Sequence, residues 1–175
     1  MKILVMGASG SGTSTLGQAL ATQLGGKHLD LDDYFWMATE PPFTQKRDRT
    51  ERLETLLHDL RAADDVVASG SLVDWGQEAE DAFNLIVFLT VPTPLRLERL
   101  RQREVKRFGA ANPAFLTWAS QYDEGPPEGR SLAKHEAWLG ERRCFILRIA
   151  GDTSVKDRVG RVLATVEGKL GGFPP

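Results

Sequence analysis

Residues 2–24 read KILVMGASGSGTSTLGQALATQL, and they carry the strongest structural signal in the chain. Residues 2–6 form an apolar run that is typical of a buried strand, and residues 7–12 are rich in glycine and serine. Residues 13–24 carry leucine on one stripe at helical spacing. The stretch therefore predicts a strand, a tight loop and a helix that begins directly after the loop.

The loop has the glycine spacing of a phosphate-binding loop. Gly7, Gly12 and Ser14 fit the pattern G-x-x-x-x-G-K-[ST], in which glycines let backbone N–H groups turn toward an anion at the positive end of a helix. The residues predicted to hold the phosphates of ATP are Gly7, Ser9, Gly10, Ser11, Gly12, Thr13, Ser14 and Thr15. The Ser14 hydroxyl also stands where a ligand of Mg²⁺ belongs, so we expect ATP and Mg²⁺ as cofactors.

Thr13 departs from the pattern, because it stands where a lysine would reach the β- and γ-phosphates. The stretch nevertheless resembles the phosphate loop of P-loop NTPases, in the branch of small nucleoside, nucleotide and metabolite kinases. It is similar to a bacterial adenylate-kinase-like group in which G-A-S-G-S-G-T-[ST]-T-L-G is the usual form. This resemblance implies that Thr13 is a feature of the group. The alternative is a strand, turn and helix whose glycines serve geometry only.

The composition narrows the function classes. A chain of 175 residues with 41% hydrophobic residues suits one domain, and a formal net charge of −2 without a long block of one sign argues against general nucleic-acid binding. The single cysteine, Cys144, excludes an intramolecular disulfide. The chain starts with strand residues and has no apolar run of about 18 residues, so we expect a cytoplasmic protein without a membrane span. We expect either a monomer or a homodimer.

Apolar segments alternate with helical patterns along the chain. Strands are expected at residues 2–6, 27–32, 65–71, 85–91 and 144–149, and helices at residues 13–24, 48–63, 74–83, 93–107, 131–141 and 154–170. This alternation predicts an α/β three-layer fold, with a parallel sheet between helices on both faces. The kinase resemblance implies five strands in the order 2-3-1-4-5. It also implies a lid at about residues 108–130, where the sequence predicts irregular structure from 109 to 129.

Acidic residues end and follow the second predicted strand. Ligands of parallel sheets bind beyond the carboxyl ends of the strands, where Asp30, Asp32 and Asp33 stand. By resemblance to shikimate- and gluconate-type kinases, Asp32 would be the base or hydroxyl partner of the acceptor, with Asp30 or Asp33 nearer the metal. Trp36 or Trp75 would line the acceptor pocket. The alternative is a solvated edge of the sheet, or Asp33 capping a turn.

Gly70 follows the third predicted strand, within Ser69-Gly70-Ser71. No carboxylate stands at this point, which argues against a motor-type or GTPase-type ATPase. In a small kinase the glycine would let the substrate approach the backbone. The alternative is a simple tight turn.

The predicted helix at residues 93–107 carries four basic residues on one face: Arg96, Arg99, Arg103 and Lys106. The resemblance to nucleotide-monophosphate kinases implies that such arginines clamp the transferring phosphate, which suits a guanidinium group. An arginine at the transition state is worth ~10³ to 10⁵ in rate, on the order of the deficit that a missing lysine leaves. We therefore assign Arg99 and Arg103 to catalysis, as compensation for Thr13. The alternative is a solvated, salt-bridged surface.

The predicted lid brings further candidates. Arg130, at its end, is assigned to substrate binding, and the aromatic Phe115, Trp118 and Tyr122 would stack on a base or pack the closed lid. The lone histidines are expected to be structural. Together the sequence predicts an ATP-dependent kinase that phosphorylates a nucleotide, a nucleoside or a small hydroxylated metabolite. Its rival is a nucleotide-binding sensor without turnover.

Overall fold

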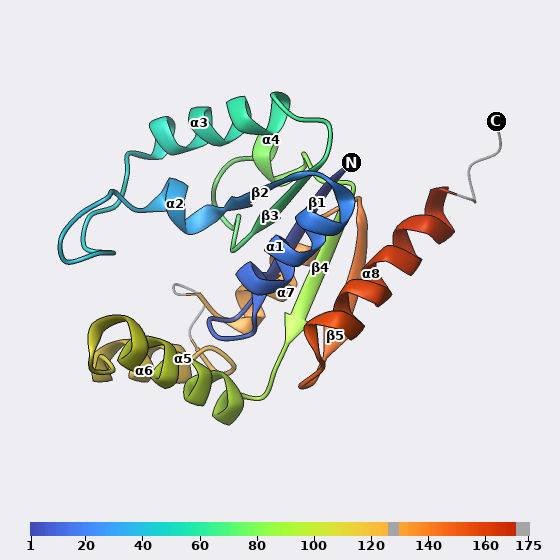
Figure 1. Ribbon diagram of the computed structural model, residues 1–175. Helices are drawn as coiled ribbons and strands as arrows, with labels where there is room; N and C mark the ends of the chain where they lie inside the picture. Colours follow the sequence, from blue (N-terminus) through green and yellow to red (C-terminus); the bar gives the residue numbers. More distant parts are fainter. Residues whose placement is uncertain (126–129, 171–175) are drawn as a thin grey trace.

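Five parallel strands form the central sheet, in the order β2-β3-β1-β4-β5 (Figure 1). They are β1 (Lys2–Gly7), β2 (Lys27–Asp30), β3 (Val66–Ser69), β4 (Leu85–Thr90) and β5 (Phe145–Ala150). The computed structural model describes residues 1–125 and 130–170. The α/β class and the strand order implied by the kinase resemblance are confirmed.

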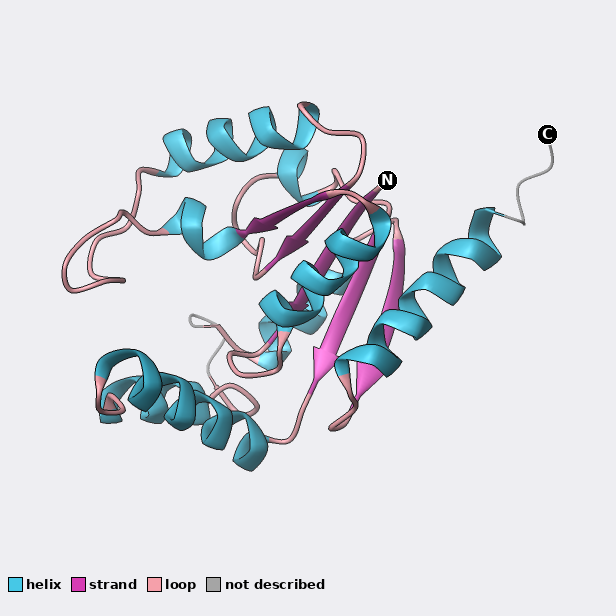
Figure 2. Ribbon diagram, viewed as in Figure 1, coloured by secondary structure: helices cyan, strands magenta, loops and turns pink. Residues whose placement is uncertain are grey.

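Helices cover both faces of the sheet (Figure 2). They are α1 (Thr13–Leu24), α2 (Leu31–Phe35), α3 (Arg49–Arg61), α4 (Gln77–Glu80), α5 (Thr93–Phe108), α6 (Pro113–Ser120), α7 (Leu132–Gly140) and α8 (Val155–Leu170). Within the described ranges, none of these helices is both long enough and apolar enough to cross a bilayer.

The buried residues of β1 divide between two cores. Ile3 and Val5 pack with α1 and α8, whereas Leu4 and Met6 pack with α3, α4 and α7 on the opposite face. A parallel strand buried on both faces reads as a continuous apolar run, which is why the sequence pattern was clear here. The end of β1 therefore lies in the middle of the carboxyl edge of the sheet, where such folds bind ligands. Helices α5 and α6 pack together beyond this edge (Figure 1).

The second strand is shorter than predicted. It ends at Asp30, and Leu31 and Asp32, which were predicted to continue the strand, begin α2. The Asp30 Oδ1 atom accepts a hydrogen bond from the backbone N–H of Asp32 at 3.1 Å and so caps the helix. Asp32 and Asp33 consequently lie in the first turn of a helix, not along the edge of the sheet.

The expectation of irregular structure at residues 109–129 was wrong for its centre, which forms α6. The Asn112 side chain accepts hydrogen bonds from the N–H groups of Ala114 and Phe115 at 3.0 and 3.3 Å, and Pro113 takes the first helical position. Asparagine followed by proline is a favourable helix start, so the sequence did hold a signal for this helix. Residues 126–129 of the predicted lid lie outside the described residues.

Candidate active site

The loop between β1 and α1 has the backbone geometry of an anion cradle. Gly10 and Gly12 have φ angles of 83° and 92°, a left-handed conformation that favours glycine. Gly12 directly precedes α1, whose first turn contains no acidic residue and no side-chain cap. The first N–H groups of a helix have no partners within the helix, so this end can receive an anion.

Two glycines let the loop pack tightly against its neighbours. A Cβ atom at Gly7 would lie 2.5 Å from the backbone oxygen of Leu89 in β4, and one at Gly10 would lie 2.6 Å from that of Arg96 in α5. Both distances are too short for any side chain. The glycine spacing therefore serves the packing of the loop as well as its turn.

The hydroxyl side chains of the loop point in different directions. Ser11 is fully buried, and its Oγ atom has no hydrogen-bond partner among the residues that the structure describes. Its backbone N–H donates to the Ala8 oxygen at 3.1 Å. Thr13 is half-buried, whereas Ser14 and Thr15 are exposed. The Ser14 hydroxyl is thus open to a ligand, and the Ser11 side chain belongs to the interior.

The charges of two arginines act on the pKa of the Asp32 carboxyl group. Its side chain is accessible to solvent, yet the surrounding protein desolvates the carboxyl group enough to raise its pKa above the ordinary value. The positive charge of Arg130 is the strongest opposing influence on this pKa, and that of Arg103 also lowers it. The neighbouring Asp30 and Asp33 carboxylates raise it further. The predicted acidic group therefore lies within electrostatic range of two of the predicted arginines.

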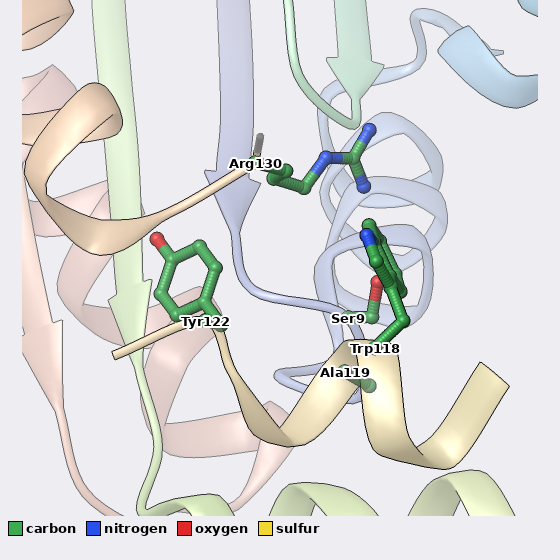
Figure 3. A pocket seen from close by; sticks show the side chains of 5 residues that line it. All are labelled: Ser9, Trp118, Ala119, Tyr122 and Arg130. Carbon is green, nitrogen blue, oxygen red and sulfur yellow. The ribbon is translucent and has the colours of Figure 1, made fainter. Parts of the chain in front are cut away.

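Arg130 belongs to a small pocket that reaches the phosphate loop. Figure 3 shows its lining side chains, which come from the loop, from α6 and from the segments that flank it: Ser9, Trp118, Ala119, Tyr122 and Arg130. The Arg130 guanidinium lies 5.9 Å from the centre of the Trp118 ring. The pocket connects the predicted lid with the phosphate loop.

Arg99 and Arg103, which the sequence analysis assigned together, have different surroundings. Arg99 forms an ion pair with Asp152, which follows β5. Arg103 is more exposed, lies 5.9 Å from the ring centre of Phe115 in α6, and acts on the pKa of Asp32. Of these two arginines, only Arg103 is among the charges that act on the pKa of Asp32.

The loop after β3 and the end of α2 flank the same edge of the sheet. Gly70 has a φ angle of 129°, and a Cβ atom there would lie 2.9 Å from that of Leu31, so this turn requires glycine. Trp36 is half-buried and packs edge-on against Phe35 and Phe43. Trp75, the other predicted pocket residue, is only 3% exposed and belongs to the core.

Sequence reasoning missed two arginines, one on α3 and one on α8. The Arg52 guanidinium lies 4.7 Å from the ring centres of both Phe35 and Trp75, and its Nε atom is buried without a hydrogen-bond partner in the described ranges. Burial lowers the pKa of Arg52. Arg158 is 3% exposed and reaches the phosphate loop from α8.

A shared signal could have found both arginines. Arg52 stands four residues before Leu56, and Arg158 stands four residues before Val162, and both of these apolar residues are fully buried. Residues at this spacing lie on the same face of a helix. A cation on a buried helix face is unusual and needs a reason.

His135 is structural, as expected, but it is more deeply placed than the sequence suggested. It is 1% exposed, its Nδ1 atom lies 2.7 Å from the Tyr122 hydroxyl, and its Nε2 atom lies 3.2 Å from the Ser71 hydroxyl. Burial, assisted by Arg130 and Lys134, lowers its pKa to about 3. His135 therefore ties the loop after β3 to the segment after α6 as a neutral ring.

The strand order and the loop define the class of fold, which is that of P-loop NTPases of the small-kinase type. A family model described as AAA domain matches residues 3–112, and the chain belongs to this family. It is 43% identical over 171 residues to the uncharacterized protein YqaC of Bacillus subtilis (strain 168), a match that covers 92% of this chain and 94% of that protein.

Solved structures of metabolite kinases have the same fold. Shikimate kinase from Bacteroides thetaiotaomicron superposes with a TM-score of 0.62 at 18% identity, covering 95% of this chain and 98% of that one. Shikimate kinase from Acinetobacter baumannii, in complex with shikimate, gives 0.61 at 18% identity, covering 96% and 93%. A gluconokinase from Sinorhizobium meliloti 1021 gives 0.53 at 20% identity, covering 93% and 89%.

Proposed function

We propose that this protein is an ATP-dependent kinase that transfers the γ-phosphoryl group to a small acceptor with a hydroxyl group. The observation that carries the proposal is that Asp32, which follows β2 at the carboxyl edge of the sheet, lies within electrostatic range of Arg130 and Arg103, and that Arg130 lines a pocket with Ser9 of the phosphate loop. Phosphoryl transfer needs a group that orients the nucleophile and cations that stabilise the charge of the transferring phosphate. Asp32 would orient the acceptor hydroxyl, and the two arginines would contact the phosphate.

The donor phosphates would bind at the start of α1. Its first backbone N–H groups would hold them, and the Ser14 hydroxyl would hold Mg²⁺, with Asp30 or Asp33 acting through water. In the part of the chain that the structure describes, no group of three or more His, Cys, Asp or Glu side chains could hold a metal by itself. This fits Mg²⁺, which is usually bound by one or two protein groups together with phosphate and water oxygens. The ion would supply charge neutralisation between the β- and γ-phosphates.

The acceptor would carry a negative charge. The guanidinium of Arg52 packs against Phe35, in the same short helix as Asp32, and its Nε atom lacks a partner in the described ranges. The Arg52 side chain as a whole is only partly buried, and an anionic group of the acceptor would pair with its charge. Gly70 and Trp36 would line the acceptor. Nucleoside monophosphates and hydroxy acids such as shikimate or gluconate meet these requirements.

A nucleotide sensor is the second candidate. Two observations favour it: Thr13 supplies no charge to the phosphates, and Arg99, one of the two arginines predicted to compensate for this, is paired with Asp152. Such a sensor would bind ATP at the same loop and release no product. With either function, the protein would bind ATP in the cytoplasm.

The test measures Mg²⁺-dependent ADP formation with a panel of nucleoside monophosphates, nucleosides and hydroxy acids, together with thermal unfolding. A ligand at 100 times its dissociation constant stabilises a protein by about 2.7 kcal/mol. We expect ATP to stabilise the protein and at least one acceptor to raise ADP release. Asp32→Asn should lower that release ~10²- to 10⁴-fold, as expected for a lost catalytic acid or base, while the matched Asp64→Asn variant, at an exposed position before β3, keeps most of it. Stabilisation by ATP with no acceptor-dependent ADP would instead identify the sensor.

A further inference from the structure

The side chain of Arg158 is a buried cation at the back of the phosphate loop. Its Nη1 atom donates a hydrogen bond to the backbone oxygen of Ser11 at 2.8 Å. Its other contacts are the Thr153 hydroxyl, 2.9 Å from Nε, and the Gly151 oxygen, 3.2 Å from Nη2. All three acceptors are neutral, and a Cβ atom at Gly12 would lie 3.3 Å from Nη1. The positive charge therefore lies directly behind the turn that starts α1.

No carboxylate neutralises Arg158 at ion-pair distance in residues 1–125 and 130–170. The adjacent Asp152 raises its pKa at longer range, but this carboxylate is paired with Arg99. Burial and the charge of Arg99 lower the pKa, yet an arginine side chain stays protonated in proteins. A buried charge without a close partner is strongly unfavourable unless something else supplies the opposite charge.

Arg96 shows what a neutralised arginine at the same loop looks like. It is 1% exposed and approaches the backbone oxygen of Ser9 at 3.4 Å. Its Nη2 atom forms an ion pair with Asp123 at 3.2 Å, and its remaining contacts join α5 to α6 and to Val91, which directly follows β4. Arg96 therefore contacts the loop with a charge that Asp123 neutralises. Arg158 contacts the loop with a positive charge that no carboxylate neutralises at ion-pair distance in the described ranges.

We infer that Arg158 supplies, from behind the loop, the positive charge for polyphosphate binding that Thr13 does not supply from the front. The Ser11 carbonyl and the Gly12 N–H belong to one peptide unit. A guanidinium group bonded to the carbonyl polarises this unit and makes the Gly12 N–H a stronger donor to phosphate. The bound phosphates in turn become the counter-charge of Arg158. Arg158 is thus a positioning residue that acts through the loop backbone.

This inference rests on the proposed function only in requiring that a nucleotide polyphosphate binds at the loop. The test measures ATP affinity by calorimetry in the full chain, with thermal unfolding of each ligand-free variant. Arg158→Gln removes the charge but keeps a donor, and should weaken ATP binding roughly 10- to 100-fold, as expected for a hydrogen bond that involves a charged group. Arg158→Lys should retain most of the affinity. Arg161→Gln, an exposed arginine one turn further along α8, should leave it unchanged.

A double variant separates charge supply from a merely structural role. Thr13→Lys should restore ATP affinity in the Arg158→Gln background and improve the wild-type affinity by a much smaller factor, because the charge is then already present. Equal gains in both backgrounds, or unchanged ATP affinity in Arg158→Gln, would overturn the inference. Should Arg158→Gln fail to fold, Thr13→Lys alone decides: a gain above about tenfold in the wild type contradicts charge supply by Arg158.

The outcomes also distinguish this inference from the proposed function. A wild-type protein that binds no ATP overturns both. A protein that binds ATP without phosphorylating any acceptor overturns the kinase function but leaves the comparison of Arg158 variants intact. Turnover with no difference between Arg158→Gln and Arg158→Lys overturns the inference alone.

Discussion

Arg99 at the middle of α5 is paired with Asp152 after β5, so its charge is neutralised within the protein. Arg103, one turn further along the same helix, lies 3.9 Å from the Glu104 carboxylate and also acts on the pKa of Asp32. The two arginines that the sequence placed on one helix face therefore have separate surroundings. Their variants should differ accordingly.

Arg103→Ala should lower kcat by ~10³-fold or more, because an arginine that contacts the transferring phosphate contributes on this order. Arg99→Ala should change kcat less than about tenfold and stability by less than about 1 kcal/mol, as exposed ion pairs contribute little. Steady-state kinetics and chemical denaturation of both variants check this. A larger loss of kcat in Arg99→Ala than in Arg103→Ala would contradict the placement.

Arg52→Met should raise the KM of an anionic acceptor roughly 10- to 100-fold, because the acceptor loses a charged hydrogen-bond donor. ATP affinity should not change, because the observed contacts of Arg52 are with Phe35 and Trp75 and not with the phosphate loop. Arg61→Met on the same helix, whose arginine pairs with Glu78 at the surface, is the matched control. If Arg52→Met and Arg61→Met changed the KM equally, the assignment of Arg52 to the acceptor site would be wrong.

The stability of the protein should fall as the pH drops from about 6.5 toward about 3, in part because of His135. Its folded-state pKa is about 3, below the ordinary 6.5, so the unfolded state takes up a proton in this window and the folded state does not. His135 contributes at most roughly 1.4 kcal/mol per pH unit to this change in stability, and it contributes no pH dependence above pH 6.5. Denaturant titrations at several pH values give the free energy of unfolding at each pH. This free energy should change less with pH in His135→Gln than in the wild type.

Other groups also titrate between about pH 3 and 6.5. The contribution of His135 is therefore taken from the difference between the wild type and His135→Gln. Burial lowers the pKa of His28 and raises that of Asp32, which act in opposite directions on stability as the pH falls. Because these groups are present in both proteins, wild type and His135→Gln are compared in the same series of buffers. An identical slope in wild type and His135→Gln would show that His135 is not the buried neutral group described above.

Asn112→Ala should destabilise the protein by about 1 kcal/mol, because the side chain caps two N–H groups at the start of α6. The Asn112→Asp variant keeps an acceptor at this point and should retain stability. Thermal unfolding measures both. Equal unfolding temperatures for wild type and Asn112→Ala would mean that the cap does not hold α6 in solution.

Local signals made much of the fold predictable. The glycine spacing at residues 7–12, the leucine stripe of α1 and the apolar run of β4 each depend on neighbours within a few residues, so they could be read directly. The end of β2 could not be placed, because Leu31 continues the alternating pattern of a strand while the Asp30 cap turns the chain into α2. The hydrogen bond between the Asp30 side chain and the Asp32 N–H marks where the strand ends, and the spacing of apolar residues gives no sign of it.

The residue types at positions 2–24 are enough to show that a strand leads through a glycine loop into a helix, and that this loop lacks a lysine. Which cations lie near the loop depends on the three-dimensional packing, because such contacts join residues far apart in the chain. Arg158 meets Ser11 across a separation of 147 residues, and Arg99 meets Asp152 across 53. Packing of α8 and α5 against the sheet brings these groups together, and whether each charge is buried or paired depends on that packing.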